Sequence, residues 1–167
     1  MRRSIRRSTP ADVPTLLRLA EEAKMIMRSS GNMKQWGAGY PSAEVFLSDI
    51  ERNASYLVID EESRQAVATF AFIPGPDPTY ARIFDGQWLD DETPYYVIHR
   101  IASLATEKGI MKTILDYAFS QTNNIRIDTH RDNVIMRHLM QKHGFSYCGI
   151  IYLANGDERL AFQQRIV

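Results

Sequence analysis

The chain has 167 residues, of which 44% are hydrophobic and 24% charged, a composition typical of one globular domain over residues 1–167. Twenty basic residues balance 20 acidic ones, so no overall charge favours nucleic acid or an anionic membrane. The single cysteine, Cys148, excludes a disulfide within the chain, and no apolar run approaches the roughly 18 residues of a membrane span. With no secretory leader in the sequence, we expect a cytoplasmic protein, either a monomer or a weak homodimer.

The first third of the chain predicts a short edge strand over residues 4–7 and then two helices. Apolar residues at helical spacing predict a helix over residues 12–28, and Pro41 and Ser42 begin a second helix that ends near residue 52. The Gly-rich loop between them carries Trp36 and Tyr40. The arginines before residue 8 leave a nucleic-acid-binding arm as a minor alternative, which the neutral overall charge disfavours.

From residue 55 the apolar pattern changes to that of strands. Residues 56–60 and 65–73 flank a polar turn, which predicts a β-hairpin. Residues 74–94 are predicted to be irregular, and a loop of that length is often functional. Strands and helices then alternate, and the predicted elements are strand 95–103, a helix from about residue 109, strand 125–129, helix 132–143 and strands 145–153 and 159–164. This order predicts an α/β fold with a mixed, partly parallel sheet and helices on both faces.

One connection between a strand and a helix has the features of a phosphate-binding loop. Gly109 lets the backbone turn tightly, and the first amides of the following helix have no partner within it. The positive end of the helix dipole lies behind these amides, and Lys108 and Lys112 add charge nearby. The alternative is an ordinary turn, which a single glycine before a helix also marks.

Four segments follow one another in the second half of the chain: residues 99–103 (His-Arg-Ile-Ala-Ser), the turn at residues 108–110, residues 126–130 (Arg-Ile-Asp-Thr-His), and a helix that runs from Asn133 to Gly144-Phe145. In this order they resemble the GNAT superfamily of N-acetyltransferases. The resemblance in topology covers nearly the whole chain, and the motifs match over residues 98–162. It implies a twisted sheet of about seven strands.

The resemblance also implies an enzyme that uses acetyl-coenzyme A and no metal. The enzyme would transfer an acetyl or short acyl group to an amine by direct attack. Ile101 and Ser103 would hydrogen-bond the pantetheine arm, and the amide of Ile101 or Ala102 would polarise the thioester carbonyl. The pyrophosphate would bind the main chain of Lys108, Gly109, Ile110, Met111 and Lys112. Asn133 would contact the same arm or, alternatively, cap its own helix.

The sequence departs from the family pattern at two places. Thr106 and Met111 replace the usual residues of the phosphate loop, and a methionine side chain there could crowd the phosphates. Met140 stands where relatives often carry a tyrosine that protonates the leaving thiolate. Both departures favour an alternative function, a non-catalytic module that binds or senses acyl-CoA.

Several residues are candidates for proton transfer. By the period-two rule, His99 shares a strand face with Ile101 and Ser103, and a histidine pKa near 6.5 suits a general base. His99 bonded within the sheet is the alternative. Asp128 and His130 would share a strand face, as a base with its orienting partner or as helix caps.

Tyr147 and Tyr152 are the hydroxyl candidates for the missing acid, and because they would point to opposite faces of a strand, at most one can act. Trp36 and Tyr40 would either line the acceptor pocket as aromatic walls or pack together as the hydrophobic core of their loop. The expected acceptor is a small-molecule amine or a peptide N-terminus, with an amino acid, a polyamine and an antibiotic among the options.

Overall fold

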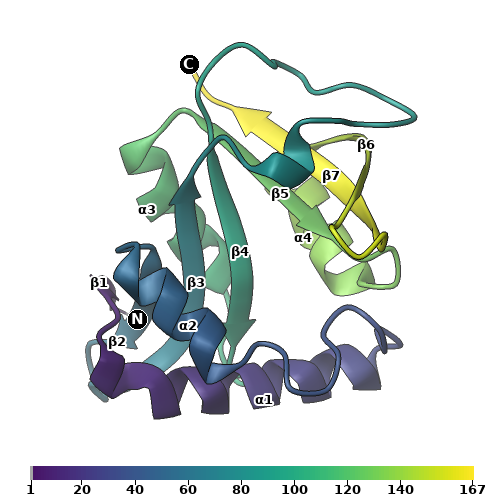
Figure 1. Ribbon diagram of the computed structural model, residues 1–167. Coiled ribbons are helices and arrows are strands. Elements are labelled where there is room, and N and C mark those ends of the chain that lie inside the picture. Colours follow the sequence, from purple (N-terminus) through teal and green to yellow (C-terminus); the bar gives the residue numbers. More distant parts are fainter. Residues whose placement is uncertain (1) are drawn as a thin grey trace.

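The computed structural model describes residues 2–167 and contains one seven-stranded sheet (Figure 1). The neighbours in the sheet follow the order β1-β2-β3-β4-β5-β7-β6, and only β4 and β5 run parallel. This arrangement confirms the predicted mixed, partly parallel sheet. The strands are β1 (Arg3–Arg7), β2 (Ser55–Asp60), β3 (Ala66–Pro74), β4 (Tyr96–Ser103), β5 (Asn124–Thr129), β6 (Ser146–Tyr152) and β7 (Glu158–Arg165).

Within residues 2–167, four α-helices cover the two faces of the sheet. Helices α1 (Val13–Ser29) and α2 (Ala43–Glu51) lie on one face, and α3 (Ile110–Gln121) and α4 (Val134–Lys142) lie on the other (Figure 1). There are also two short 3-10 helices. The first, η1 (Pro10–Asp12), directly precedes α1, and the second, η2 (Pro78–Tyr80), lies within the long loop before β4. In the part of the chain that the structure describes, no helix is long and apolar enough to cross a membrane.

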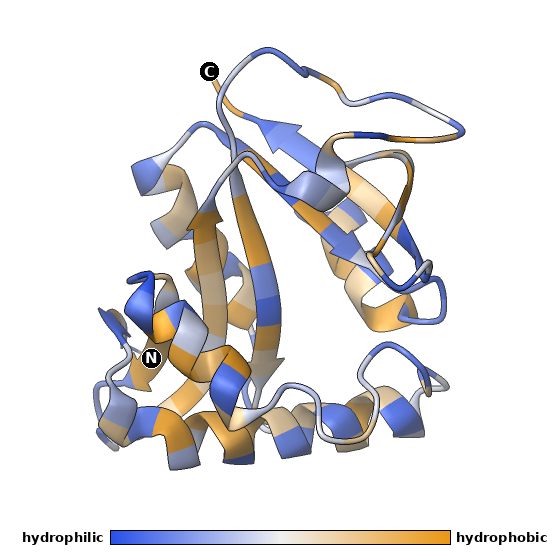
Figure 2. Cartoon of the chain, in the orientation of Figure 1, coloured by the Kyte–Doolittle hydropathy of each residue, from blue (hydrophilic) through white to orange (hydrophobic). Residues whose placement is uncertain are grey.

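The apolar residues that predicted the elements form the core between them. Leu16, Leu19 and Ala20 follow one stripe of α1 and pack on Leu57 of β2. On the opposite face, α3 and α4 cover a larger cluster that contains aromatic residues of β2 and β3. Strand β3 is the most continuously apolar strand in Figure 2, because helices cover both of its faces.

The segment between β3 and β4 covers the part of the sheet that α1 and α2 leave open. Tyr80 and Trp88 pack there on residues of β4, β6 and β7. The guanidinium carbon of Arg126 on β5 lies 3.9 Å from the ring centroids of both Trp88 and Tyr95. Because the cation is enclosed by two aromatic faces, it fixes this irregular segment to the sheet.

Candidate active site

The two parallel strands β4 and β5 separate soon after they meet. They pair only through Tyr96 with Ile125 and Val97 with Arg126, after which the strands diverge (Figure 1). A cavity of about 560 Å³ occupies the opening. Residues of β4, β5, the start of α4, the loop after α1 and the β6–β7 turn line it. The divergence therefore places elements from distant parts of the sequence around one hollow.

A β-bulge in β4 determines which side chains enter this cavity. Ala71 of β3 lies opposite His99 and Thr69 lies opposite Ala102, so Arg100 and Ile101 together face the single residue Phe70. Arg100 adopts a left-handed φ of 53°, which costs free energy for a residue other than glycine. Its guanidinium is held by the carboxylate of Asp49, with nitrogen–oxygen distances of 2.7 and 2.6 Å.

The bulge overturns the prediction that His99 shares a strand face with Ile101 and Ser103. Ile101 packs with Ile98 on the α3 side of the sheet. The ring of His99 lies instead against Tyr80, on the opposite side, where Val97 is also buried. The extra residue shifts the alternation by one position, so the period-two rule fails across it.

His99 lies between two carboxylates. Its Nε2 is 3.2 Å from an oxygen of Asp77, and its Nδ1 is 3.9 Å from an oxygen of Asp128. The exposed fraction of the His99 side chain is 23%, and the residue lines the cavity. Burial alone would raise the pKa of Asp77, but hydrogen bonds from His99 and Thr79 lower it to about 2. Asp77 therefore stays ionised beside the imidazole.

Asp128 is held by a buried phenol. The hydroxyl of Tyr80 donates to the Asp128 carboxylate at 2.5 Å. Burial and the adjacent charge of Asp128 raise the pKa of Tyr80 well above its ordinary value, so the hydroxyl remains a donor. The indole of Trp88 donates to the Tyr80 carbonyl, which ties this cluster to the irregular segment.

Sequence reasoning missed Asp77 and Tyr80 because both lie in the segment predicted to be irregular. A local signal was present. Asp77 precedes Pro78 and accepts hydrogen bonds from the amide and hydroxyl of Thr79, as an N-cap residue does. That signal marks a helix start, and only the folded structure shows that the second carboxylate oxygen of Asp77 reaches His99.

The predicted pair of Asp128 and His130 is not formed. Asp128 contacts Tyr80 and His99, whereas Nδ1 of His130 accepts from the amide of Asp132. His130 therefore caps the turn before α4, which is its expected alternative role.

Among the predicted main-chain contacts on β4, the amide of Ser103 is directed away from β3. The amide of Leu104 donates to Val67 of β3. Because amides alternate along a regular strand, that of Ala102 also faces β3, and that of Ser103 faces the edge that β5 has left. Ile101 lies in the bulge, where this rule does not apply. Of the two amides expected to polarise a carbonyl, that of Ala102 is directed into the sheet, and the role of Ile101 stays a prediction.

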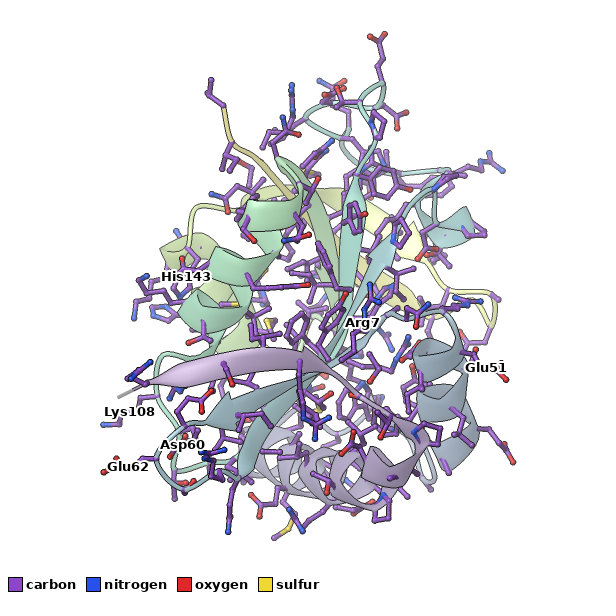
Figure 3. The ribbon with its side chains drawn as sticks, turned by 90° about the vertical axis from the view of Figure 1, so that its left-hand side faces the viewer. Arg7, Glu51, Asp60, Glu62, Lys108 and His143 are labelled. Carbon is purple, nitrogen blue, oxygen red and sulfur yellow. The ribbon has the colours of Figure 1, made fainter. Side chains whose placement is uncertain are left out.

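The predicted phosphate loop has the expected helix start. Gly109 precedes α3 with a left-handed φ of 72°, and an added Cβ would meet only Arg3, at 3.8 Å. Met111 does not crowd the loop, contrary to expectation, because its side chain is buried in the core with Ile110. Lys108 is exposed near the start of β1 (Figure 3), and Lys112 is paired with Asp116 at 2.6 Å.

Arg3 of β1 contacts this loop, a role that sequence analysis did not identify. Its guanidinium donates to the carbonyl of Lys108 at 2.6 Å and to the hydroxyl of Thr113 at 3.2 Å. Glu107 lies 3.7 Å from the same group. A strand at the other end of the sequence thus fixes the turn before α3.

Asn133 begins α4 and is almost completely buried. Its side-chain oxygen accepts from the amide of Met136, and its nitrogen donates to Gln35 at 3.0 Å. The expected alternative of a helix cap is therefore realised. Its contact with a cofactor arm stays a prediction, and Asn133 does line the cavity. Gln35 was not predicted, and it joins the loop after α1 to the start of α4.

Trp36 and Tyr40 both line the cavity, with ring centroids 6.3 Å apart. Trp36 is also buried against α1 and α2, so it fills the core and walls the cavity at once. The Tyr40 hydroxyl accepts from Arg100 at 3.2 Å.

Tyr147 and Tyr152 do not line this cavity. Tyr147 packs on Phe162 beside a separate hollow over α4, and Tyr152 packs on Phe84. A bulge between Tyr147 and Gly149 also breaks the alternation on which the prediction of opposite faces rested. Met140 is fully buried.

The sequence matches no known family profile and no curated protein. Among solved structures, the chain is similar to a GNAT-family acetyltransferase from Streptococcus agalactiae, at 30% identity and a TM-score of 0.88, over 99% of this chain and 96% of that one. It shares its fold with a GNAT-family acetyltransferase from Listeria monocytogenes, at 18% identity and a TM-score of 0.71 over 98% and 95% of the two chains. It also shares its fold with the PaiA N-acetyltransferase from Thermoplasma acidophilum, solved with coenzyme A, at 15% identity and a TM-score of 0.68 over 99% and 100%.

Proposed function

Because this chain belongs to the GNAT family of acetyltransferases, we propose that it transfers an acetyl group from acetyl-CoA to an amine. The observation that carries the proposal is the divergence of β4 from β5, with unpaired main-chain donors on one side of the opening and His99 between two carboxylates on the other. The transfer is direct, without an acyl-enzyme. Cys148, the one thiol, is buried, and burial raises its pKa, so it is a poor nucleophile.

The residues around the opening fit acetyl-CoA as a substrate. The amides of Ile101 and Ser103 would hydrogen-bond the pantetheine arm as a neighbouring strand does. The first amides of α3, at residues 110–112, would bind the pyrophosphate at the positive end of the helix dipole. The open space at Gly109 lets a phosphate approach the backbone there.

His99 would remove the proton from the acceptor ammonium. A carboxylate accepts and does not donate, so Asp77 fixes the proton on Nε2 and leaves the lone pair on Nδ1. Asp128, oriented by Tyr80, attracts the ammonium to the same nitrogen. After transfer, Asp77 stabilises the imidazolium, as a carboxylate does for the base in other nucleophilic mechanisms.

The amide of Ile101 would donate to the thioester oxygen as negative charge develops on it. The three positions considered for protonating the leaving thiolate do not supply an acid, because Met140 carries no proton and Tyr147 and Tyr152 lie outside the cavity. A thiol with a pKa near 8.5 leaves as the thiolate without that help.

Calorimetric titration with acetyl-CoA, followed by a thiol-release assay over a panel of amines, tests this function. Binding together with acceptor-dependent release of coenzyme A supports it. Tight binding without release on any amine would favour the alternative of a non-catalytic acyl-CoA sensor, which the buried methionine at position 140 suggests.

A further inference from the structure

The cavity contains a buried cation without a counter-charge. Arg159 has an exposed fraction of 6% and lines the cavity at the start of β7. Its guanidinium donates only to two main-chain carbonyls, those of Glu158 at 2.9 Å and Gln35 at 3.2 Å. Two carbonyls leave most of its five N–H donors unused and leave its charge uncompensated.

The other buried ionised side chains of residues 2–167 all have partners. Lys24 lies 3.5 Å from Glu21, Asp49 binds Arg100, and Arg126 contacts Asp91 at 3.1 Å. Across residues 2–167, no carboxylate lies within 4.0 Å of Arg159. The nearest carboxylates in sequence are engaged elsewhere, since Glu158 pairs with Arg131 and Asp157 accepts from Asn155. An uncompensated buried guanidinium is costly unless a ligand supplies the anion.

Arg159 faces the same side of the sheet as His99. It pairs with Ile151, which is buried in one cluster with Val97 and Ala161. Ala161 in turn lies opposite Asp128 on β5. Arg159 is therefore the diagonal neighbour of Asp128, at about 7–8 Å between Cα atoms. The start of α3, where a pyrophosphate would bind, is on the other face.

The cavity is thus negative around His99 and positive at Arg159. We propose that the acceptor carries a carboxylate a few bonds from its amine, as an amino acid does, and that Arg159 binds this carboxylate. The inference rests on the proposed function for the identity of the reacting amine. A guanidinium can hold a carboxylate through two parallel hydrogen bonds, which would orient the amine toward Nδ1 of His99.

Binding to the protein saturated with coenzyme A tests the proposal without requiring turnover. The probes are amino acids, each matched with the amine that its decarboxylation gives, and the measurement is calorimetric titration. We expect at least one amino acid to bind at least about tenfold more tightly than its amine. In Arg159→Gln this preference should disappear while the affinity of the amine is retained, and Arg159→Lys should keep part of it. Arg131→Gln, a surface arginine paired with Glu158, is the matched control.

Equal affinity of the wild-type protein for amino acid and amine would overturn the proposal, and so would failure of every amino acid to bind. An equal loss of both affinities in Arg159→Gln would mean that Arg159 only ties β7 to the loop at Gln35. The wild-type comparison needs no substitution, so it decides the matter even if a variant does not fold. The proposed function fails by a different result, the absence of acetyl-CoA binding or of thiol release.

Discussion

His99 and Asp77 meet across 22 residues of sequence, with 3.2 Å between the imidazole Nε2 and the carboxylate. Asp77 reaches the histidine because the N-cap of η2 uses only one of its oxygens. The other oxygen is free to fix the tautomer of the ring.

Replacing His99 by glutamine should lower kcat by about 10²–10⁴-fold, because the variant keeps a polar side chain but has no base. The dissociation constant of acetyl-CoA, measured by calorimetry, should stay nearly unchanged. His138→Gln, on the exposed surface of α4, is the control and should keep full activity. Wild-type turnover in His99→Gln would remove this histidine from the mechanism.

Asp77 should contribute to stability only above acidic pH. Its folded pKa of about 2 lies below the ordinary 3.8, so its contribution is complete above pH 3.8 and is lost as pH falls toward 2. Urea unfolding of the wild type and of Asp77→Asn should therefore differ by about 1 kcal/mol at pH 6, allowing for solvent screening. The difference should shrink at pH 3. A difference in unfolding free energy that is larger at pH 3 than at pH 6 would contradict the lowered pKa of Asp77.

Gly109→Val should weaken acetyl-CoA binding by more than about tenfold, or roughly 1.4 kcal/mol. A β-branched residue resists the left-handed φ of 72°, and the turn that presents the α3 amides would change. Gly31→Val is the matched control, since Gly31 also has a positive φ and open space but lies after α1. Calorimetry should show intact binding in the control, and intact binding in Gly109→Val would exclude the loop as the phosphate site.

Turnover should rise with pH as the acceptor amine loses its proton and then level off. No basic limb is expected, because Tyr80, the phenol in the cluster, has its pKa raised well above the ordinary value. The measurement is kcat against pH. A bell-shaped profile whose basic limb vanishes in Tyr147→Phe or Tyr152→Phe would instead identify a general acid.

Met140→Tyr should destabilise the protein by about 1–3 kcal/mol, because the added volume and hydroxyl enter a fully packed position. The new hydroxyl should not protonate the leaving thiolate. Thermal unfolding measures the loss, and Met136→Tyr at the cavity wall, which is only partly buried, should cost less. Higher turnover in Met140→Tyr at unchanged stability would show that position 140 can face the reacting thioester.

Periodicity and turn residues were sufficient to predict the helices, the strands and the mixed sheet, because each buries one apolar stripe or face. They could not reveal the bulge, since an arginine with a left-handed φ has no local signature and is stabilised by Asp49, 51 residues earlier. The same limit applies to Asp77, Tyr80 and Arg159, whose roles depend on contacts across the sheet. The hydroxyls of Tyr147 and Tyr152 suit a general acid chemically, but the positions of both residues in the fold exclude them from the cavity.

The short pairing of β4 with β5 divides the sheet into two parts that are joined by few backbone hydrogen bonds. The part formed by β1 to β4 and the part formed by β5 to β7 share only two register pairs in the sheet. A ligand arm that hydrogen-bonds Ile101 and Ser103 would fill the gap between β4 and β5 and connect the two parts. Deuterium uptake at these two amides should therefore be fast in the free protein and slow when the ligand is bound. With the ligand bound, the two parts of the sheet should unfold together and at a higher temperature.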